Sequence, residues 1–471
     1  MTKLSDSVFK LVSKGKADNL IDVSKYVSSK TGLTVTIADV ESPLVNGHFC
    51  LATETHDDAG LPHTLEHLVF MGSEQYPFKG VLDLLANRCL ASGTNAWTDT
   101  DHTCYTLTTA GSEGFLKLLP VYLDHILFPM LTEDQYLTEV HHINGEGEDA
   151  GVVYCEMQEH ESKLMALTEY EMKKQLFPPP CGYGVETGGR IASIRTLCNV
   201  NRVREFHSSY YRPENLNVIV TGKIKAEDVF QALEGFESKI ESKTKCNGDS
   251  YTRPWSSPIP PLSKSADVSI PCPTDDDPRG VVCLAWHGPT SNEYYDSQAL
   301  DTLFKYLTDT AVSPLEQRLI QIEDPYCSDI GGTLLDQSVC LIHFTAKGVK
   351  SEKLPFIKEK IFECLNSLVD GSEPFDLKRM ADVLEQSILS DQKQLEDSPH
   401  DAIANMVIGD FLYGSSVDDF QKRLNDVAIL RDLKTKDSKF WIDLIRMYFL
   451  DRPCVARILF PRYSVGLEKT Q

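Results

Sequence analysis

The chain has 471 residues, which is more than one hydrophobic core usually supports, so we expect at least two domains. Its composition, with 41% hydrophobic and 24% charged residues, is typical of a soluble globular protein. The net charge of −23 argues against nucleic-acid binding, which needs a basic surface, and suits the attraction of basic peptides.

The first half of the chain alternates between patterns typical of strands and of helices. Strands are expected at 33–37, 49–53, 103–108 and 216–221, where apolar and polar residues alternate. Helices are expected where apolar residues recur at helical spacing, at 61–70, 81–90, 115–128, 151–167 and 226–240. Residues 93–98 break the helical pattern before the third strand.

Residues 246–265 have a different composition, with prolines among Ser and Gly and no apolar period, which predicts a linker. Beyond it, strands are expected at 281–286 and 454–460, with long helices at 297–308, 354–368 and 376–389. Both halves mix strands and helices, so we predict an α+β fold with two domains of similar size, 1–245 and 266–471. The halves share no clear sequence identity.

Residues His63-Thr64-Leu65-Glu66-His67 form the pattern H-x-x-E-H, an inverted zinc-binding signature. On a helix, His63 and His67 are one turn apart and point the same way, so both imidazoles can reach one zinc ion. Glu66 lies at the margin of that face, where it can contact a metal-bound water rather than the metal. The spacing therefore predicts a zinc site.

The same side chains could instead form a polar helix face or a small hydrogen-bond cluster. Their neighbours are largely apolar, which predicts that the helix is buried, and buried ionisable groups need partners or a metal. We therefore favour the metal site. The apolar neighbours are Leu61, Leu65, Leu68, Val69 and Phe70.

Zinc hydrolases use three protein ligands and leave one position for water, so a third ligand must come from elsewhere. Asp149 and Glu156 are two helical turns apart and can share a face, and Glu156 follows an apolar run that predicts an inward position. The alternative is a solvated acidic helix face. The acids of this stretch are Glu146, Glu148, Asp149, Glu156, Glu159 and Glu161. Rival ligands are His102, His141, His142 and His160.

Six motifs, in order, resemble the pitrilysin and insulin-degrading enzyme superfamily, and most closely its presequence protease branch. They are the H-x-x-E-H run continuing to Tyr76-Pro77, the N-A-aromatic-T segment 94–98, the D-x-T-x-Y segment 101–105, the G-V-V-x-x-E-M segment 151–157, and the segments 183–189 and 211–215. The similarity runs through the first 225 residues and continues more weakly to about residue 460.

The resemblance implies a zinc metalloendopeptidase that hydrolyses unfolded peptides with a metal-activated water. It also implies two α/β-sandwich domains, each an antiparallel-rich sheet with helices packed on it, forming one half of a peptidase chamber. The first domain would carry the zinc site and the second would lack one. The residues it assigns are His63, His67 and Glu156 as zinc ligands, Glu66 as general base, Asp149 as an outer-shell acid, and Asn95 and Ala96 as contacts of the substrate backbone.

Members of this branch are longer and pair two such halves, so the resemblance covers an N-terminal half only. We expect it to work with a second half or a partner subunit. The alternatives are a catalytically idle truncated form and a non-enzymatic structural subunit of the same superfamily. The intact set of His63, Glu66, His67 and Glu156 speaks against the structural subunit.

Thirteen cysteines are scattered without a C-x-x-C pair, which predicts free thiols in a reducing compartment. No run of 18 apolar residues occurs, so no membrane span is expected. The first thirty residues lack the apolar core of a secretory signal, and acids interrupt any transit-peptide pattern. We therefore expect a cytoplasmic location, with the mitochondrion as the alternative.

Overall fold

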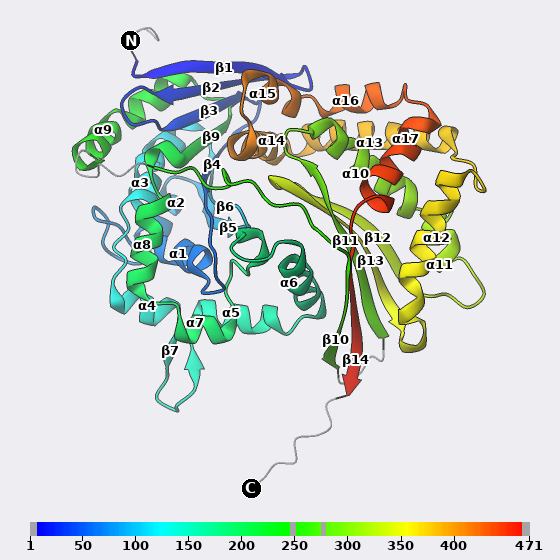
Figure 1. The fold of residues 1–471 in the computed structure, drawn as a ribbon. Helices are drawn as coiled ribbons and strands as arrows, with labels where there is room; N and C mark the ends of the chain where they lie inside the picture. The colour runs from blue at the N-terminus through cyan, green and yellow to red at the C-terminus, as the bar shows by residue number, and fades with distance from the viewer. Residues whose placement is uncertain (1–6, 245–250, 275–278, 464–471) are drawn as a thin grey trace. The chain divides into compact units, whose positions relative to one another are not determined.

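The computed structural model of the chain describes residues 7–244, 251–274 and 279–463 (Figure 1). It consists of two compact units, each assembled from three segments of the chain. Unit 1 comprises Met1–Ser162, Val185–Pro258 and Gln394–Asn425, and unit 2 comprises Lys163–Gly184, Ile259–Lys393 and Asp426–Gln471.

Unit 1 is built on a seven-stranded sheet with the order β1-β2-β3-β9-β4-β6-β5. Neighbouring strands are antiparallel except for the pair β3 and β9. The strands are β1 (Phe9–Ala17), β2 (Ile21–Ser28), β3 (Thr34–Asp39), β4 (Leu44–Ala52), β5 (Ala91–Thr98), β6 (His102–Ala110) and β9 (Leu216–Gly222). A separate hairpin consists of β7 (His142–Ile143) and β8 (Asp149–Ala150).

Helices cover both faces of this sheet. Successive residues of a strand point to opposite faces, and here apolar residues point to both, so each face needs a cover. Phe49 and Leu51 of β4 join the core that contains α1, α3, α8 and α9, whereas Cys50 joins a second core that contains α14. The helices of unit 1 are α1 (Leu61–Val69), α2 (Val81–Arg88), α3 (Ser112–Leu127), α4 (Glu133–Glu139), α5 (Val152–Glu161), α7 (Ile191–Thr196), α8 (Val200–Tyr210), α9 (Ala226–Thr244), α14 (Pro399–Tyr413) and α15 (Val417–Arg423).

Unit 2 has a five-stranded sheet with the order β10-β14-β11-β13-β12, in which only β10 and β14 are parallel. Its strands are β10 (Ala266–Thr274), β11 (Arg279–Thr290), β12 (Asp329–Leu335), β13 (Val339–Lys350) and β14 (Val455–Tyr463). Its helices are α6 (Leu164–Leu176), α10 (Tyr294–Thr308), α11 (Pro314–Leu319), α12 (Ile357–Asp370), α13 (Leu377–Asp397), α16 (Asp426–Leu433) and α17 (Ser438–Ile445).

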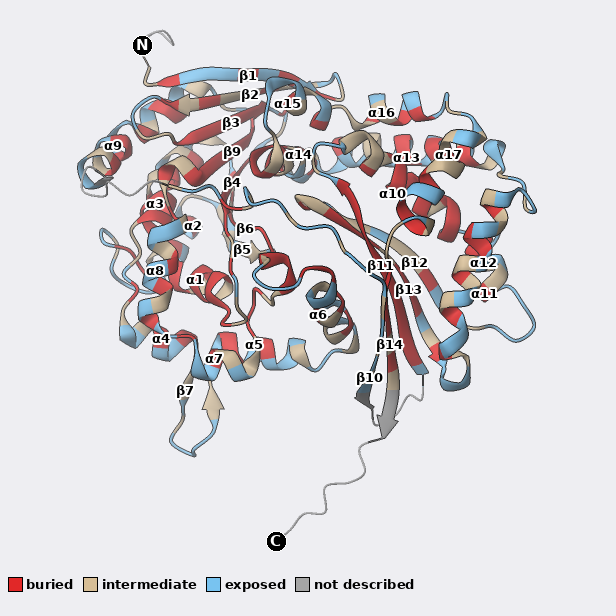
Figure 2. Ribbon diagram, viewed as in Figure 1, coloured by how far each residue is buried: buried red, intermediate tan, exposed pale blue. Residues whose placement is uncertain are grey.

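Strand β11 shows how the sheet of unit 2 is buried. Leu284 and Trp286 pack into the core formed with α10, α12 and α17, while Cys283, directly before Leu284, contacts Met172 of α6 on the opposite face. Buried positions accordingly run along the middle strands and the inner faces of the helices (Figure 2). Two antiparallel-rich sheets with packed helices confirm the predicted α+β fold.

Each compact unit contains segments from both of the predicted domains, 1–245 and 266–471. Those domain boundaries stay a prediction. Helix α6 comes from the first half but packs on β11 and β14 of unit 2. Helix α14 comes from the second half but packs on β9 and β4 of unit 1. Residues 251–265 of the predicted linker are irregular, and residues 246–250 lie outside the described residues. None of the described helices combines the length and hydropathy needed to cross a lipid bilayer.

Burial of His48 predicts that the fold loses stability in mild acid. His48 lies on β4 with 5% of its surface exposed, and burial lowers its pKa to about 4, despite Asp401 3.9 Å away, which raises it. Between pH 6.5 and about 4 the unfolded chain binds a proton at this position and the folded chain does not. The free energy of unfolding should therefore fall as pH drops through this window, by up to about 3 kcal/mol from this residue.

Urea unfolding of the wild type and of His48→Gln at several pH values measures this contribution. The variant should show a shallower dependence of unfolding free energy on pH between 6.5 and 4, because Gln does not titrate. Equal slopes in the two proteins would show that His48 is protonated alike in both states.

Candidate metal centre

Helix α1 presents the two histidines of the H-x-x-E-H pattern on its partly exposed side. Leu65 and Leu68 are completely buried, which fixes the rotation of the helix. The side chains of His63 and His67 then keep 19% and 18% of their surface exposed. The helix begins after Gly60, whose φ of +74° favours glycine, and a Cβ there would lie 2.5 Å from the carbonyl oxygen of Gly188.

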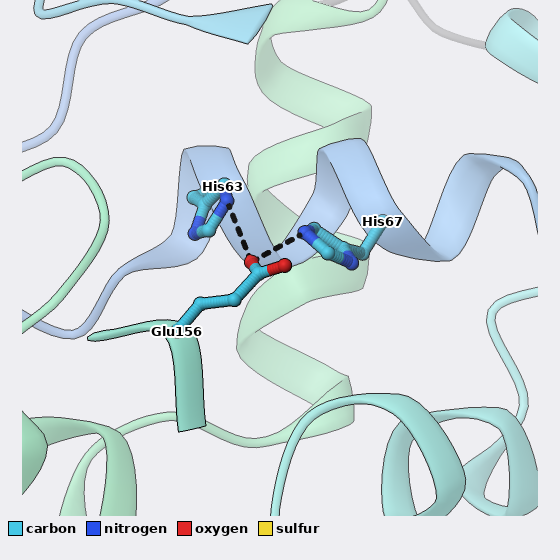
Figure 3. A group of neighbouring side chains, drawn as sticks. All are labelled: His63, His67 and Glu156. Carbon is cyan, nitrogen blue, oxygen red and sulfur yellow. Dashed lines mark ion pairs between the residues drawn. The ribbon is translucent and has the colours of Figure 1, made fainter. Parts of the chain in front are cut away.

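Helix α5 brings Glu156 to these two imidazoles (Figure 3). Val153 and Met157 are buried on the inner side of α5, so Glu156 projects from a different side toward α1. Its Oε2 atom lies 3.7 Å from Nε2 of His63 and 3.3 Å from Nε2 of His67. Residues 93 positions apart in the chain thus converge on one point.

The three side chains fit the donor set of a zinc site. Ligand atoms about 2.0–2.1 Å from a tetrahedral zinc ion are about 3.3 Å from one another. One potential ligand atom from each of His63, His67 and Glu156 lies within 4.8 Å of the others, and two nitrogens and one carboxylate oxygen are typical zinc ligands. Burial, with help from the neighbouring His67, lowers the pKa of His63 to about 4, which favours the neutral imidazole that binds metal.

Glu66 is buried beside this donor set, with 8% of its surface exposed. Its Oε2 atom accepts a hydrogen bond of 2.5 Å from the hydroxyl of Thr98 on β5. Burial raises the pKa of Glu66, and the nearby charge of Glu156 raises it further, while the Thr98 hydrogen bond and His67 oppose the change. A carboxylate with a raised pKa is suited to accept and return a proton near neutral pH.

The carboxylate that contacts the imidazole of His67 is Glu139, at the end of α4, and not Asp149. Glu139 Oε1 lies 3.1 Å from Nδ1 of His67, and its Oε2 accepts a hydrogen bond of 3.1 Å from Lys79. Asp149 instead accepts from Nε2 of His141 at 2.8 Å and pairs with Arg195 at 3.2 Å. The structure thus places Asp149 against His141 and Arg195 rather than against His63 or His67, and its outer-shell role stays a prediction.

The β7–β8 hairpin explains why Glu139, and not Asp149, lies beside His67. The backbone N–H of Tyr154 donates to the carbonyl of Val140 over 3.2 Å, which is the bond that residue 150 would accept in an unbroken helix. Helix α5 thus resumes where α4 ends, and residues 141–150 are looped out. In the sequence, Asp149 lies seven positions before Glu156. When the looped-out residues 141–150 are left out of the count, Glu139 lies seven positions before Glu156 instead.

The junction itself depends on Gly151. Its φ is +130°, and a Cβ at this position would lie 2.2 Å from the carbonyl oxygen of Val140. The sequence did contain a signal for the hairpin, because Asn144-Gly145 is a preferred turn pair. The side chain of Asn144 accepts hydrogen bonds from the N–H groups of Glu146 and Glu148 within that turn.

Asn95 and Ala96 lie on β5, the last strand of the seven-stranded sheet. Among the described residues no strand pairs with the outer edge of β5. The carbonyl of Asn95 accepts from Thr106 of β6 at 3.2 Å, and Ala96 packs on the main core. Their assignment as substrate contacts stays a prediction.

The rival ligands have other surroundings. His102 is buried, donates to Asp101 over 2.7 Å and accepts from the indole of Trp97 over 3.1 Å. His141 holds Asp149 at the base of the hairpin. Within the described residues, His63, His67 and Glu156 form the one group of three or more potential ligands, and it includes neither these histidines nor His142 or His160.

Comparison with known families matches two stretches of the chain. Residues 51–175 match the family described as insulinase, peptidase family M16, and residues 198–384 match the peptidase M16 inactive domain. A protein of Caenorhabditis elegans, described as uncharacterized, is 42% identical over 90% of this chain and 42% of its own length. The mitochondrial presequence protease of Saccharomyces cerevisiae is 26% identical over 87% of this chain and 42% of its own length.

Solved structures show the same fold. A protease from Helicobacter pylori superposes with a TM-score of 0.75 at 20% identity, covering 94% of this chain and 100% of that one. A peptidase M16 inactive domain from Pseudomonas fluorescens gives a TM-score of 0.69 at 12% identity, covering 93% and 98%. The chain spans less than half the length of the curated relatives it matches. The chain belongs to the pitrilysin superfamily, peptidase family M16.

Proposed function

We propose that this chain is the catalytic half of a zinc metalloendopeptidase. The observation that carries this proposal is the convergence of His63 and His67 from one helix and Glu156 from another, with Glu66 buried next to them. These residues would hold the metal, and bound zinc would lower the pKa of a coordinated water toward 7 and polarise a peptide carbonyl.

The residues of the chain then have distinct tasks. Glu139 holds Nδ1 of His67, which leaves Nε2 directed at Glu156 and fixes the ring orientation. Glu66 would accept a proton from the attacking water and pass it to the leaving amine. Its partial burial keeps this exchange away from bulk solvent, and Thr98 fixes one of its two oxygens.

The free edge of β5 supports a peptide as substrate. An extended peptide can add to this edge as a further strand, held by main-chain hydrogen bonds that tolerate varied side chains. Asn95 and Ala96 lie on this strand directly before Trp97 and Thr98. Strand β5 would therefore contact both the bound peptide, along its edge, and Glu66, through Thr98. The net charge of −23 favours basic, unfolded peptides.

Metal removal tests the proposal. The purified protein should contain about one zinc ion per chain. A chelator should abolish cleavage of an unfolded basic peptide and lower the thermal midpoint, and an equivalent of zinc should restore both. A chain that binds no zinc, or that cleaves equally well after chelation, would contradict the assignment.

The second half of the assembly is also part of this proposal. The relatives are more than twice as long as the segment they share with this chain, so we infer that full activity requires a second half or a partner subunit. A zinc-loaded chain that is monomeric and cleaves no peptide would favour an idle form, and an absence of zinc would favour a structural subunit.

We place the protein in the cytoplasm, with the mitochondrion as the alternative.

A further inference from the structure

Two hydroxyl groups lead from Glu66 into the core of unit 1. Thr98 Oγ1 donates to Glu66 Oε2 over 2.5 Å and lies 3.3 Å from Thr103 Oγ1. The phenols of Tyr105 and Tyr211 form a separate pair, with their oxygens 2.9 Å apart. Thr103 is completely buried, which shields the two threonine hydroxyls from water on the core side.

The register of β5 and β6 places these two threonines. Thr98 is directly opposite Thr103 in the antiparallel pair, and Ala96 is opposite Tyr105. Side chains of opposed residues emerge on the same face of a sheet, and residues two apart on a strand share that face. Thr98, Thr103 and Tyr105 therefore all project toward α1, where Glu66 lies.

The chemistry of a carboxylate gives these hydrogen bonds a direction. Ionised Glu66 can only accept, so Thr98 must donate its proton to it. The oxygen of Thr98 is then free to accept from Thr103, 3.3 Å away. Both hydroxyl protons then point toward Glu66, and hydrogen bonds aligned in this way strengthen one another in a low-dielectric interior.

We propose that Thr98, supported by Thr103, is a positioning residue that holds the Glu66 carboxylate in one orientation for proton transfer. This inference rests on the proposed function, because it gives Glu66 the role of general base. It adds that β5 sets the position of the base as well as offering an edge to the peptide. A peptide that shifts β5 on binding would therefore move Glu66 through Thr98.

Thr98→Val removes the hydroxyl at nearly constant volume and provides the main test. We expect kcat on an unfolded peptide to fall about 10- to 100-fold, as for a lost hydrogen bond to a charged group, with KM and zinc content unchanged. Thr98→Ser should restore most of kcat because it keeps the hydroxyl. Thr103→Val, one hydroxyl further from Glu66, should lower kcat by less than Thr98→Val.

Two matched controls separate positioning from core stability. Thr36→Val also deletes a buried hydroxyl in the same sheet, one that donates to Asn217 Oδ1 over 3.1 Å away from the site. Tyr122→Phe deletes a buried phenol that has no hydrogen-bond partner among the described residues. Both controls should keep the wild-type kcat, whatever they do to the thermal midpoint.

Crystal structures of the full-length wild type and of Thr98→Val supply a readout that does not depend on activity. The wild type should show one Glu66 rotamer in contact with Thr98, and Thr98→Val should show a displaced or split carboxylate. An inactive, zinc-loaded wild type would refute the proposed function, while the Glu66 rotamers would still decide the positioning role. An unmoved Glu66, or a kcat in Thr98→Val equal to that of the wild type, would overturn the inference.

Discussion

A Glu66→Gln variant should bind zinc like the wild type and lose peptide cleavage, with kcat lower by about 10²–10⁴-fold. Gln keeps the shape of the side chain and can still accept the hydrogen bond from Thr98, but it cannot take a proton from water. The three proposed ligands are not altered, so zinc analysis and peptide digestion of the same preparation separate the two effects.

Glu237→Gln is a suitable control for this change. Glu237 is buried to 2% exposure and accepts a hydroxyl hydrogen bond of 2.5 Å from Ser28, as Glu66 does from Thr98, but it lies on α9 among structural contacts. Its neutral variant should keep the wild-type kcat. Turnover retained in Glu66→Gln at normal zinc content would show that another group accepts the proton.

Local periodicity predicts those parts of the site that depend on neighbours in the chain. Apolar residues at helical spacing predict α1, and the spacing within H-x-x-E-H predicts that His63 and His67 share one side of it. The distance of Glu156 from α1 depends on how α5 packs, which no local pattern contains. The resemblance to a family supplied that ligand, and periodicity alone left it among several acids and histidines.

Strand β5 illustrates a second limit. Residues 93–98 have glycine and small polar residues with weak strand preference, so the sequence predicts only a break in the helical pattern there. They become a strand because β6 pairs with them, from Thr94 opposite Leu107 to Thr98 opposite Thr103. The hydrogen bond from Thr98 to Glu66 follows from this pairing and could not be derived from either segment alone.

Helices α5 and α6 show the same dependence on tertiary packing. The stretch 151–167 carries one continuous helical pattern, yet the structure divides it into α5, which supports Glu156, and α6, which packs on the sheet of unit 2. Ser162 and Lys163 separate the two helices. A helix pattern predicts the elements, whereas the choice of sheet depends on contacts far along the chain.

The looped-out hairpin leads to the second large prediction, which distinguishes Glu139 from Asp149. Glu139→Gln should weaken zinc binding by about 10- to 100-fold, because a carboxylate on Nδ1 fixes the imidazole and raises its basicity. Asp149→Asn should leave zinc affinity unchanged, because Asp149 contacts His141 and Arg195 at the base of the hairpin. Competition with a zinc chelator of known affinity measures both constants.

The two variants are matched, since each replaces a carboxylate by its amide and each carboxylate pairs with one histidine. Each carboxylate also pairs with one basic side chain, Lys79 for Glu139 and Arg195 for Asp149, so the difference that bears on zinc is whether the histidine is a proposed ligand. If Asp149→Asn lost the metal and Glu139→Gln retained it, the linear spacing would be the correct guide and the helix junction at Val140 and Tyr154 would not form in solution. The expected order instead follows from counting along the spliced helix, in which the backbone bond between these two residues brings Glu139 to His67.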